Sequence, residues 1–118
     1  MVHIISVRHL FEFAEGNSQY KKAIEAWATI VKHCDWNKPQ DMVEEFGPKA
    51  VDILPNLKDQ SCDRVVFDIK GNQLRVIAKY QFHSKLKKSR LYLCWIGTHK
   101  DYDKICKTDK QYTINSFI

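Results

Sequence analysis

The chain lacks a long hydrophobic run, and this absence excludes a membrane-spanning helix. Its uninterrupted apolar stretches are short, such as Val65–Phe67 and Leu93–Ile96, whereas a spanning helix needs about 20 apolar residues. The opening residues, MVHIISVRH, also lack the apolar region and the cleavage site of a signal peptide. We therefore expect a cytoplasmic protein that makes no contact with a membrane.

Patterns that bind metals or form disulfides are also missing. The four cysteines, Cys34, Cys62, Cys94 and Cys106, form no CxxC pair or Cys/His ladder, so no zinc site is predicted. A disulfide framework does not suit a core-bearing chain without a signal peptide, and we expect reduced, mostly buried thiols. DxD, HExxH and Gly-rich phosphate loops are absent. We expect no metal and no cofactor.

The charge, by contrast, is concentrated in one part of the chain. Residues 1–69 carry 8 Lys/Arg and 11 Asp/Glu, whereas residues 70–110 carry 11 Lys/Arg and 3 Asp. A basic half of this kind attracts a polyanion, with nucleic acid as the first candidate. The alternative to nucleic-acid binding is that the lysines only prevent association at an exposed edge of the sheet.

Helical periodicity dominates the first half of this 118-residue chain. Ser6 is positioned to cap a helix over Val7–Glu15. A second helix follows Ser18, and a third begins at Pro39 and ends at Gly47–Pro48. The second helix has the clearest apolar stripe, made of Tyr20, Ala23, Ile24, Trp27, Ile30, Val31 and Cys34.

The second half changes to the alternation of β-strands. After a short strand at residues 3–6 and a loop expected at 49–62, three strands are predicted: DRVVFDIK, QLRVIAKYQFH and RLYLCWIGT. Gly71–Asn72 marks a tight hairpin between the first two. We therefore predict one α+β domain over residues 1–118, with N-terminal helices packed on one face of an antiparallel β-sheet.

Alternation also predicts which side chains face the helices. Leu74, Val76, Ala78, Tyr80 and Phe82 share one face of their strand, and Trp95 with the leucines of the last strand is expected in the same core. The other face of the sheet is expected to be open to solvent and to carry polar side chains. These are Arg75, Lys79 and Thr98, with His99 and Tyr102 at the rim.

Such a face suits a phosphodiester. Arg binds phosphate oxygens in a bidentate manner, Lys adds a point charge, Tyr can stack on a base, and His can move a proton near neutral pH. Each residue also has an ordinary explanation. His99 could be a surface or capping residue, Tyr102 could pack a short helix, and Arg75 and Lys79 could be solvated. On these residues alone, the chain is a basic α+β domain that suits RNA.

Two motifs at a characteristic spacing resemble the HigB toxin family. They are VFDIKGNQLRVI and GTHKDYDKI, and the opening HIISVRHLFEF and the pair Asp35–Trp36 add to the similarity, which covers about residues 1–105. The resemblance implies one RelE-like toxin domain over residues 1–118, with an irregular C-terminal tail from about 106. It also implies a toxin of a type II toxin–antitoxin pair that cuts mRNA in the ribosomal A site without a metal ion.

The resemblance also implies roles for individual residues. Arg75 and Lys79 would stabilise phosphate charge, His99 would transfer a proton, and Tyr102 would orient or stack. Three further motif residues, Asn72, Thr98 and Asp103, would have structural roles. The candidates for RNA binding are Lys85, Lys87, Lys88, Arg90 and Lys100.

One position departs from the family pattern, because Cys94 stands where an Arg is usual. Loss of a preorganised cation at a reacting phosphate costs on the order of 10²–10³ in rate. The alternative function is therefore a catalytically weak or inactive relative that binds RNA, the ribosome or an antitoxin. In either form, the resemblance implies a HigA-like helix-turn-helix antitoxin as partner.

Overall fold

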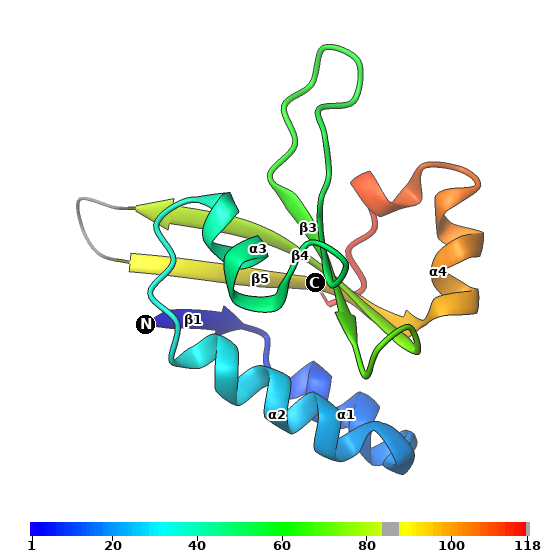
Figure 1. The fold of residues 1–118 in the computed structure, drawn as a ribbon. Coiled ribbons are helices and arrows are strands. Elements are labelled where there is room, and N and C mark those ends of the chain that lie inside the picture. The colour runs from blue at the N-terminus through cyan, green and yellow to red at the C-terminus, as the bar shows by residue number, and fades with distance from the viewer. Residues whose placement is uncertain (84–87, 118) are drawn as a thin grey trace.

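A computed structural model describes residues 1–83 and 88–117 and shows helices on both sides of one five-stranded sheet (Figure 1). No helix in this described part is long and apolar enough to cross a membrane. The elements are β1 (Val2–Ile5), α1 (Arg8–Gly16), α2 (Lys21–Lys32), α3 (Pro39–Phe46), β2 (Val51–Ile53), β3 (Arg64–Ile69), β4 (Leu74–His83), β5 (Lys88–Thr98) and α4 (His99–Cys106), with 3₁₀ turns at Ser18–Tyr20 and Lys110–Tyr112.

The strands follow the order β1-β5-β4-β3-β2. The predicted antiparallel series β3-β4-β5 is confirmed, and so is the α+β class. Two details differ from the prediction. The segment expected as a loop contains β2, which pairs with β3, and β1 pairs in parallel with β5. The sheet is therefore mixed rather than antiparallel, because the chain leaves β1 through three helices before the meander forms.

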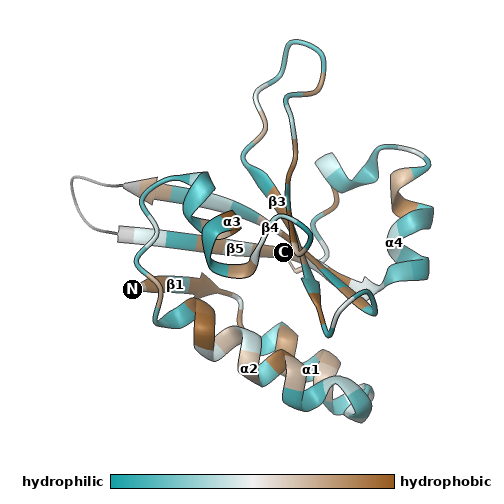
Figure 2. Ribbon diagram, in the orientation of Figure 1, coloured by the Kyte–Doolittle hydropathy of each residue, from teal (hydrophilic) through white to brown (hydrophobic). Residues whose placement is uncertain are grey.

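The main core lies between the sheet and the three N-terminal helices, as predicted. Leu74, Val76 and Ala78 of β4 are fully buried there, and the apolar colouring of Figure 2 marks the same inner layer. Aromatic rings fill its centre, where the Trp27 and Phe67 ring centroids are 5.2 Å apart in an edge-on arrangement. Removal of this apolar surface from water provides most of the stabilisation of the fold. The gain in free energy is about 25 cal/mol per Å² of apolar surface buried.

The helix predictions are correct in position but not in every side chain. Ser6 does not cap α1; it takes φ 69°, and the residue before the helix is Val7, whose side chain makes no capping bond. Ile30 was placed on the buried stripe of α2 but is 46% exposed. The third helix begins at Pro39 as predicted, and Asp41 in its first turn accepts a hydrogen bond from the backbone N–H of Lys38 at 3.2 Å.

A β-bulge in β5 changes which side chains face the helices. Ile77 pairs with Trp95 and Ala78 with Leu93, which leaves Cys94 as an extra residue between the two pairs. Before the bulge Leu93 faces the helices, whereas after it Ile96 does. Trp95, predicted in the same core as the leucines, instead packs with the second cluster on the other face, because the extra residue reverses the alternation.

The second face of the sheet is not open, as alternation alone suggested, because α4 and the C-terminal tail cover it. Ile77 and Cys94 are buried there beneath Tyr102, Tyr112 and Ile114, and this burial raises the pKa of the Cys94 thiol. Cys34 is also buried, whereas Cys62 and Cys106 are only half-buried. The expected burial of the thiols is therefore found for two of the four cysteines.

The C-terminal tail from about residue 106 was expected to be irregular. Its described residues after α4, 107–117, include a 3₁₀ turn and pack on the second face of the sheet. The Arg64 guanidinium donates to the carbonyl oxygens of Gln111 at 3.1 Å and Ile114 at 2.7 Å. The Ser116 N–H donates to the Cys94 carbonyl at 2.8 Å, and the Phe117 ring stacks on His9 with centroids 4.6 Å apart. The tail is therefore part of the fold.

Candidate functional site

A polar network lies at the end of the sheet where the β3–β4 turn meets the end of β5. The register places Arg75 of β4 between Asp68 of β3 and Gly97 of β5. The turn includes Gly71 at φ 62°, a conformation that glycine adopts without strain. The His99 N–H donates to the Gln73 carbonyl at 3.0 Å, which ties the first residue of α4 to this turn.

Arg75 is the centre of the network. It is only 8% exposed, and its Nε lies 3.0 Å from Asp68 Oδ1. Its Nη2 donates to Asn72 Oδ1 at 2.5 Å and to His99 Nδ1 at 2.9 Å. The two motifs GN..R and TH..YD therefore meet at one guanidinium, although they are separated by more than 20 residues in the chain.

The contact with Arg75 determines the tautomer of His99. A guanidinium can only donate, so Nδ1 accepts and the ring proton of the neutral imidazole is on Nε2. That nitrogen lies 3.3 Å from Asp103 Oδ2, one helical turn further along α4. The His99 side chain is 43% exposed, whereas that of Arg75 is 9% exposed. His99 is thus the member of this pair that a ligand can reach.

Tyr102 lies beside the network and is partly covered. Its ring centroid is 5.9 Å from the Arg75 guanidinium carbon and 6.3 Å from the Trp95 ring. Burial, and then a hydrogen bond with Cys106, raises the pKa of Tyr102 above its usual value of 10.0. The phenol therefore remains protonated at neutral pH, which suits orientation of a ligand or stacking rather than proton abstraction.

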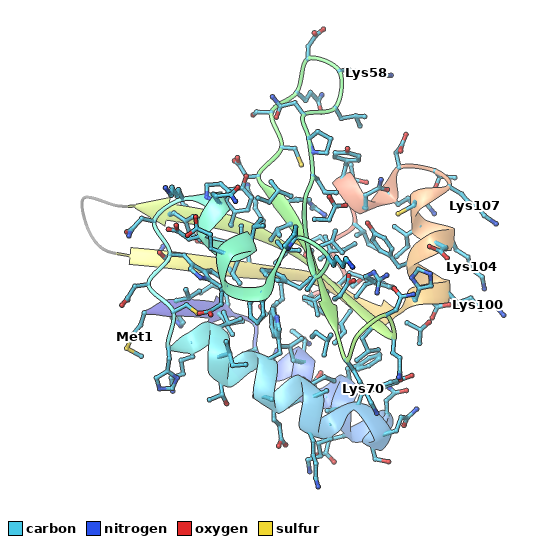
Figure 3. All side chains as sticks on the ribbon, in the orientation of Figure 1. Met1, Lys58, Lys70, Lys100, Lys104 and Lys107 are labelled. Atoms are coloured by element: carbon cyan, nitrogen blue, oxygen red, sulfur yellow. The ribbon has the colours of Figure 1, made fainter. Side chains whose placement is uncertain are left out.

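The start of α4 explains the remaining motif residues. Thr98 is the N-cap, and its Oγ1 accepts a hydrogen bond from the Asp101 N–H at 3.3 Å. Asp103 faces His99 as described, so it contacts the network as well as the helix. The lysines of α4 and the following turn, Lys100, Lys104 and Lys107, point away from the molecule into solvent (Figure 3).

Lys79 does not join this network in the described part of the structure. It is four residues from Arg75 on β4, about 13 Å along the strand, and the buried Ile77 and Cys94 lie between. Arg90 pairs through its backbone with His3 and Gln81, far along β5 from His99. Lys85 and Lys87 lie outside the described residues, and the side chain of Lys88 is not described either.

A cavity of about 600 Å³ adjoins the network on the side of the β3–β4 turn. Asp68 and Asn72 line it, together with Phe46 at the end of α3 and with Pro48 and Lys49 of the segment that links α3 to β2. This volume lies within the range of about 300–1,000 Å³ that is usual for small-ligand sites. Room for a ligand therefore exists beside groups that contact Arg75.

Sequence reasoning missed Asp68, the carboxylate that pairs with Arg75. Burial raises the pKa of this carboxyl group, an effect that the nearby Arg75 and His99 charges oppose. Counting back across the Gly71 hairpin would have found it, because the same number of residues separates Asp68 and Arg75 from the turn. Within the described residues, no group of three or more His, Cys, Asp or Glu is placed to hold a metal ion.

The α+β fold, with this network at the end of its last strand, is consistent with a RelE-like toxin. The profile of the HigB toxin family, the RelE-like toxic component of a toxin–antitoxin system, matches residues 20–105. That range is most of the chain and contains the whole network, so the chain belongs to the HigB toxin family.

Curated relatives agree with this membership. The chain is 29% identical over 102 residues to the mRNA interferase toxin HigB of Escherichia coli K12, covering 86% of this chain and 88% of the relative. It is 30% identical over 106 residues to the mRNA interferase HigB of Escherichia coli O6:H1, covering 90% and 93%. The mRNA interferase HigB of Shigella flexneri matches at 29%, with 86% and 88% covered.

Proposed function

We propose that this protein is the toxin of a type II toxin–antitoxin pair and an endoribonuclease that cuts mRNA in the ribosomal A site. One observation carries the proposal: an accessible histidine, His99, is held at 2.9 Å by the buried Arg75. The relatives named mRNA interferase support the same activity. A cytoplasmic location follows from this target.

The proposed reaction uses the RNA itself as nucleophile. The 2′-hydroxyl attacks the adjacent phosphorus, the bond to the 5′-oxygen breaks, and a 2′,3′-cyclic phosphate and a 5′-hydroxyl result. One proton leaves the 2′-hydroxyl and one reaches the 5′-oxygen, and His99 is the group that transfers protons. Because RNA supplies the nucleophile, the reaction needs no metal-bound water.

In this proposal Arg75 positions His99 and supplies positive charge close to the phosphate. Four of its five N–H groups have partners: Asp68, Asn72, His99 and the Leu74 carbonyl at 3.2 Å. A guanidinium held on so many sides loses little freedom when the transition state forms. Tyr102 completes the site by stacking on a base or orienting the ribose, and Lys79 adds charge further along the RNA.

The proposed partners are mRNA on the ribosome and a HigA-like helix-turn-helix antitoxin that neutralises the toxin. The family description names a toxin–antitoxin system and so supports an antitoxin partner. The basic half of the chain, residues 70–110, supports a polyanionic target.

The experiment that tests this function is induced expression in a host that lacks the antitoxin, combined with primer extension on ribosome-bound mRNA. We expect the intact chain to arrest growth and to cut the mRNA. His99→Ala should lower the cleavage rate by about 10²–10⁴-fold, the usual contribution of a proton-transfer group, and Arg75→Ala by about 10²–10³-fold through loss of a preorganised charge. Both variants should restore growth.

His33→Ala is the matched control, because His33 is an exposed histidine at the end of α2, outside the network. It should leave both growth arrest and cleavage intact. Normal growth on expression of the intact chain would contradict the active enzyme. In that case, Cys94→Arg shows whether the departure from the family pattern has weakened catalysis, since this change should then restore toxicity.

A further inference from the structure

A second cavity, of about 390 Å³, lies on the tail-covered face of the sheet. Arg64, Lys79, Gln81 and Tyr92 line it from three neighbouring strands, and Asn115 lines it from the tail. The buried Ile77 and Cys94 separate it from the Arg75 network. Asn115 also lies beyond the residues 20–105 that match the family profile. One side of this cavity is therefore formed by a part of the chain that the profile does not cover.

The cavity carries positive charge that a ligand can use. Lys79 is exposed, and the Arg64 guanidinium is bonded to two carbonyl oxygens, which leave its full charge in place. The carboxylate of Asp63 also lines the cavity, so the lining keeps one net positive charge. An anionic ligand that brings one phosphate matches this balance.

The other lining groups suit a nucleobase. Tyr92 is directly opposite Lys79 across the β4–β5 ladder and is half-buried. Its hydroxyl donates to Gln81 Oε1 at 3.1 Å, which holds the ring in one orientation. A fixed aromatic face can stack on an unpaired base, while the exposed amides of Gln81 and Asn115 can bond to the edge of that base.

We propose that this cavity binds one nucleotide of the single-stranded RNA that flanks the cleavage point. Lys79 and Arg64 contact its phosphate, Tyr92 stacks on its base, and Asn115 contacts the base edge. The inference rests on the proposed function, because it assigns the RNA a second contact about 13 Å along β4 from Arg75. One RNA strand can reach both places.

The test is an NMR titration of the full-length His99→Ala protein with the dinucleotide UpU, which requires neither ribosome nor cleavage. We expect the backbone amide of Tyr92 to show a saturable shift at up to about 10 mM UpU, where millimolar binding is complete. Tyr92→Leu should weaken binding at least about 5-fold through lost stacking. Tyr92→Phe keeps the ring and should retain binding.

Asn115→Asp tests the contribution of the tail without a change of side-chain shape. It removes the amide N–H donors that face the base edge and adds a negative charge to the cavity lining, so it should weaken UpU binding about 5-fold. Gln40→Glu is the matched control, since Gln40 is an exposed amide on α3, across the sheet. This variant has the same net charge as Asn115→Asp and should bind UpU as the parent does.

Three outcomes would overturn the inference: no saturable shift at Tyr92, equal affinity of Asn115→Asp and the parent, or equal shifts with inorganic phosphate alone. Failure of the proposed function looks different. It would show as an intact chain that does not cut ribosome-bound mRNA, whether or not UpU binds in the cavity.

Discussion

At the scale of single residues, the site combines a buried cation with an exposed imidazole. Arg75 is held by partners on several sides, and the His99 side chain contacts Arg75 on one nitrogen and Asp103 on the other. Proton transfer needs an accessible group, whereas orientation needs a fixed one. The exposed His99 provides the accessible group, and the buried Arg75 provides the fixed one.

Asp68 leads to a prediction about pH. Burial raises the pKa of its carboxyl group above the usual 3.8, so the folded state binds this proton more tightly than the unfolded state. The contribution of Asp68 to stability is therefore greatest below the unfolded pKa and is lost as pH rises through the folded one. We expect wild type to lose stability relative to Asp68→Asn as pH rises from about 3 to about 7.

Urea unfolding of wild type and Asp68→Asn at a series of pH values measures this difference. The other titrating groups are shared by the two proteins and largely cancel in the comparison. A difference that grows in favour of wild type as pH rises would contradict the prediction, because it would mean that pairing with Arg75 outweighs burial.

Gly97 leads to a prediction about packing. A Cβ at this position would lie 2.4 Å from the indole of Trp95, and that ring also packs near Tyr102. Gly97→Ala must displace the indole, which costs about 1–3 kcal/mol of unfolding free energy. Urea unfolding measures it, and Gly16→Ala, whose Cβ would meet nothing within 4 Å, should cause no loss. Equal stability of the two variants would contradict this account.

At the scale of elements, the sequence predicted most helices and strands but not how the second face is covered. Three strands, three helices and the Gly71 hairpin follow from periodicity and turn residues. The bulge at Cys94 does not, because LYLCWI is apolar throughout and no alternation remains to reveal an extra residue. The docking of Ile114 and Tyr112 was equally hidden, since scattered apolar residues in a tail show no period.

The tail leads to a prediction at this scale. Truncation after Thr108 removes Tyr112 and Ile114 from the cluster over Cys94 and leaves Arg64 without its two carbonyl partners. We expect the unfolding free energy to fall by about 2–4 kcal/mol, from lost apolar burial. Urea unfolding and hydrogen exchange at Cys94 and its β5 neighbours measure the loss.

Ile114→Ala provides a milder test of the same element. It should act in the same direction by about 1–2 kcal/mol, because it removes only one half-buried side chain. An unchanged urea midpoint in both proteins would mean that the tail does not contribute to the fold.

At the scale of the whole molecule, the candidate site was predicted in part. Asn72, Arg75, His99, Tyr102 and Asp103 come together as the motifs implied, although their roles remain predictions. Lys79 does not, because it lies four positions along β4 from Arg75 and an apolar cluster fills the interval. Alternation places residues on a face, but it does not show what else covers that face.

The uneven charge leads to a prediction about salt. If residues 70–110 contact RNA phosphates, the affinity of the His99→Ala protein for mRNA-bound ribosomes should fall as KCl rises, with a log–log slope of about −0.7 per phosphate contacted. Lys79→Glu should make this slope shallower by about 0.7 or more. Lys22→Glu, an equal charge change at an exposed site on α2, should not, and equal slopes would contradict the prediction.

The bulge in β5 accommodates one extra residue without changing the pairing on either side of it. Upstream of Cys94, odd-numbered side chains point to the helices, and downstream of it even-numbered ones do. Cys94 and Trp95 are therefore consecutive residues on the face that α4 and the tail cover. Deletion of Cys94 would restore regular alternation from Leu93 to Trp95 and leave every later side chain on its present side. Gly97 would remain opposite Arg75, and His99 would still start α4 next to the guanidinium. A one-codon deletion at Cys94 should therefore remove the bulge and keep the two motifs together.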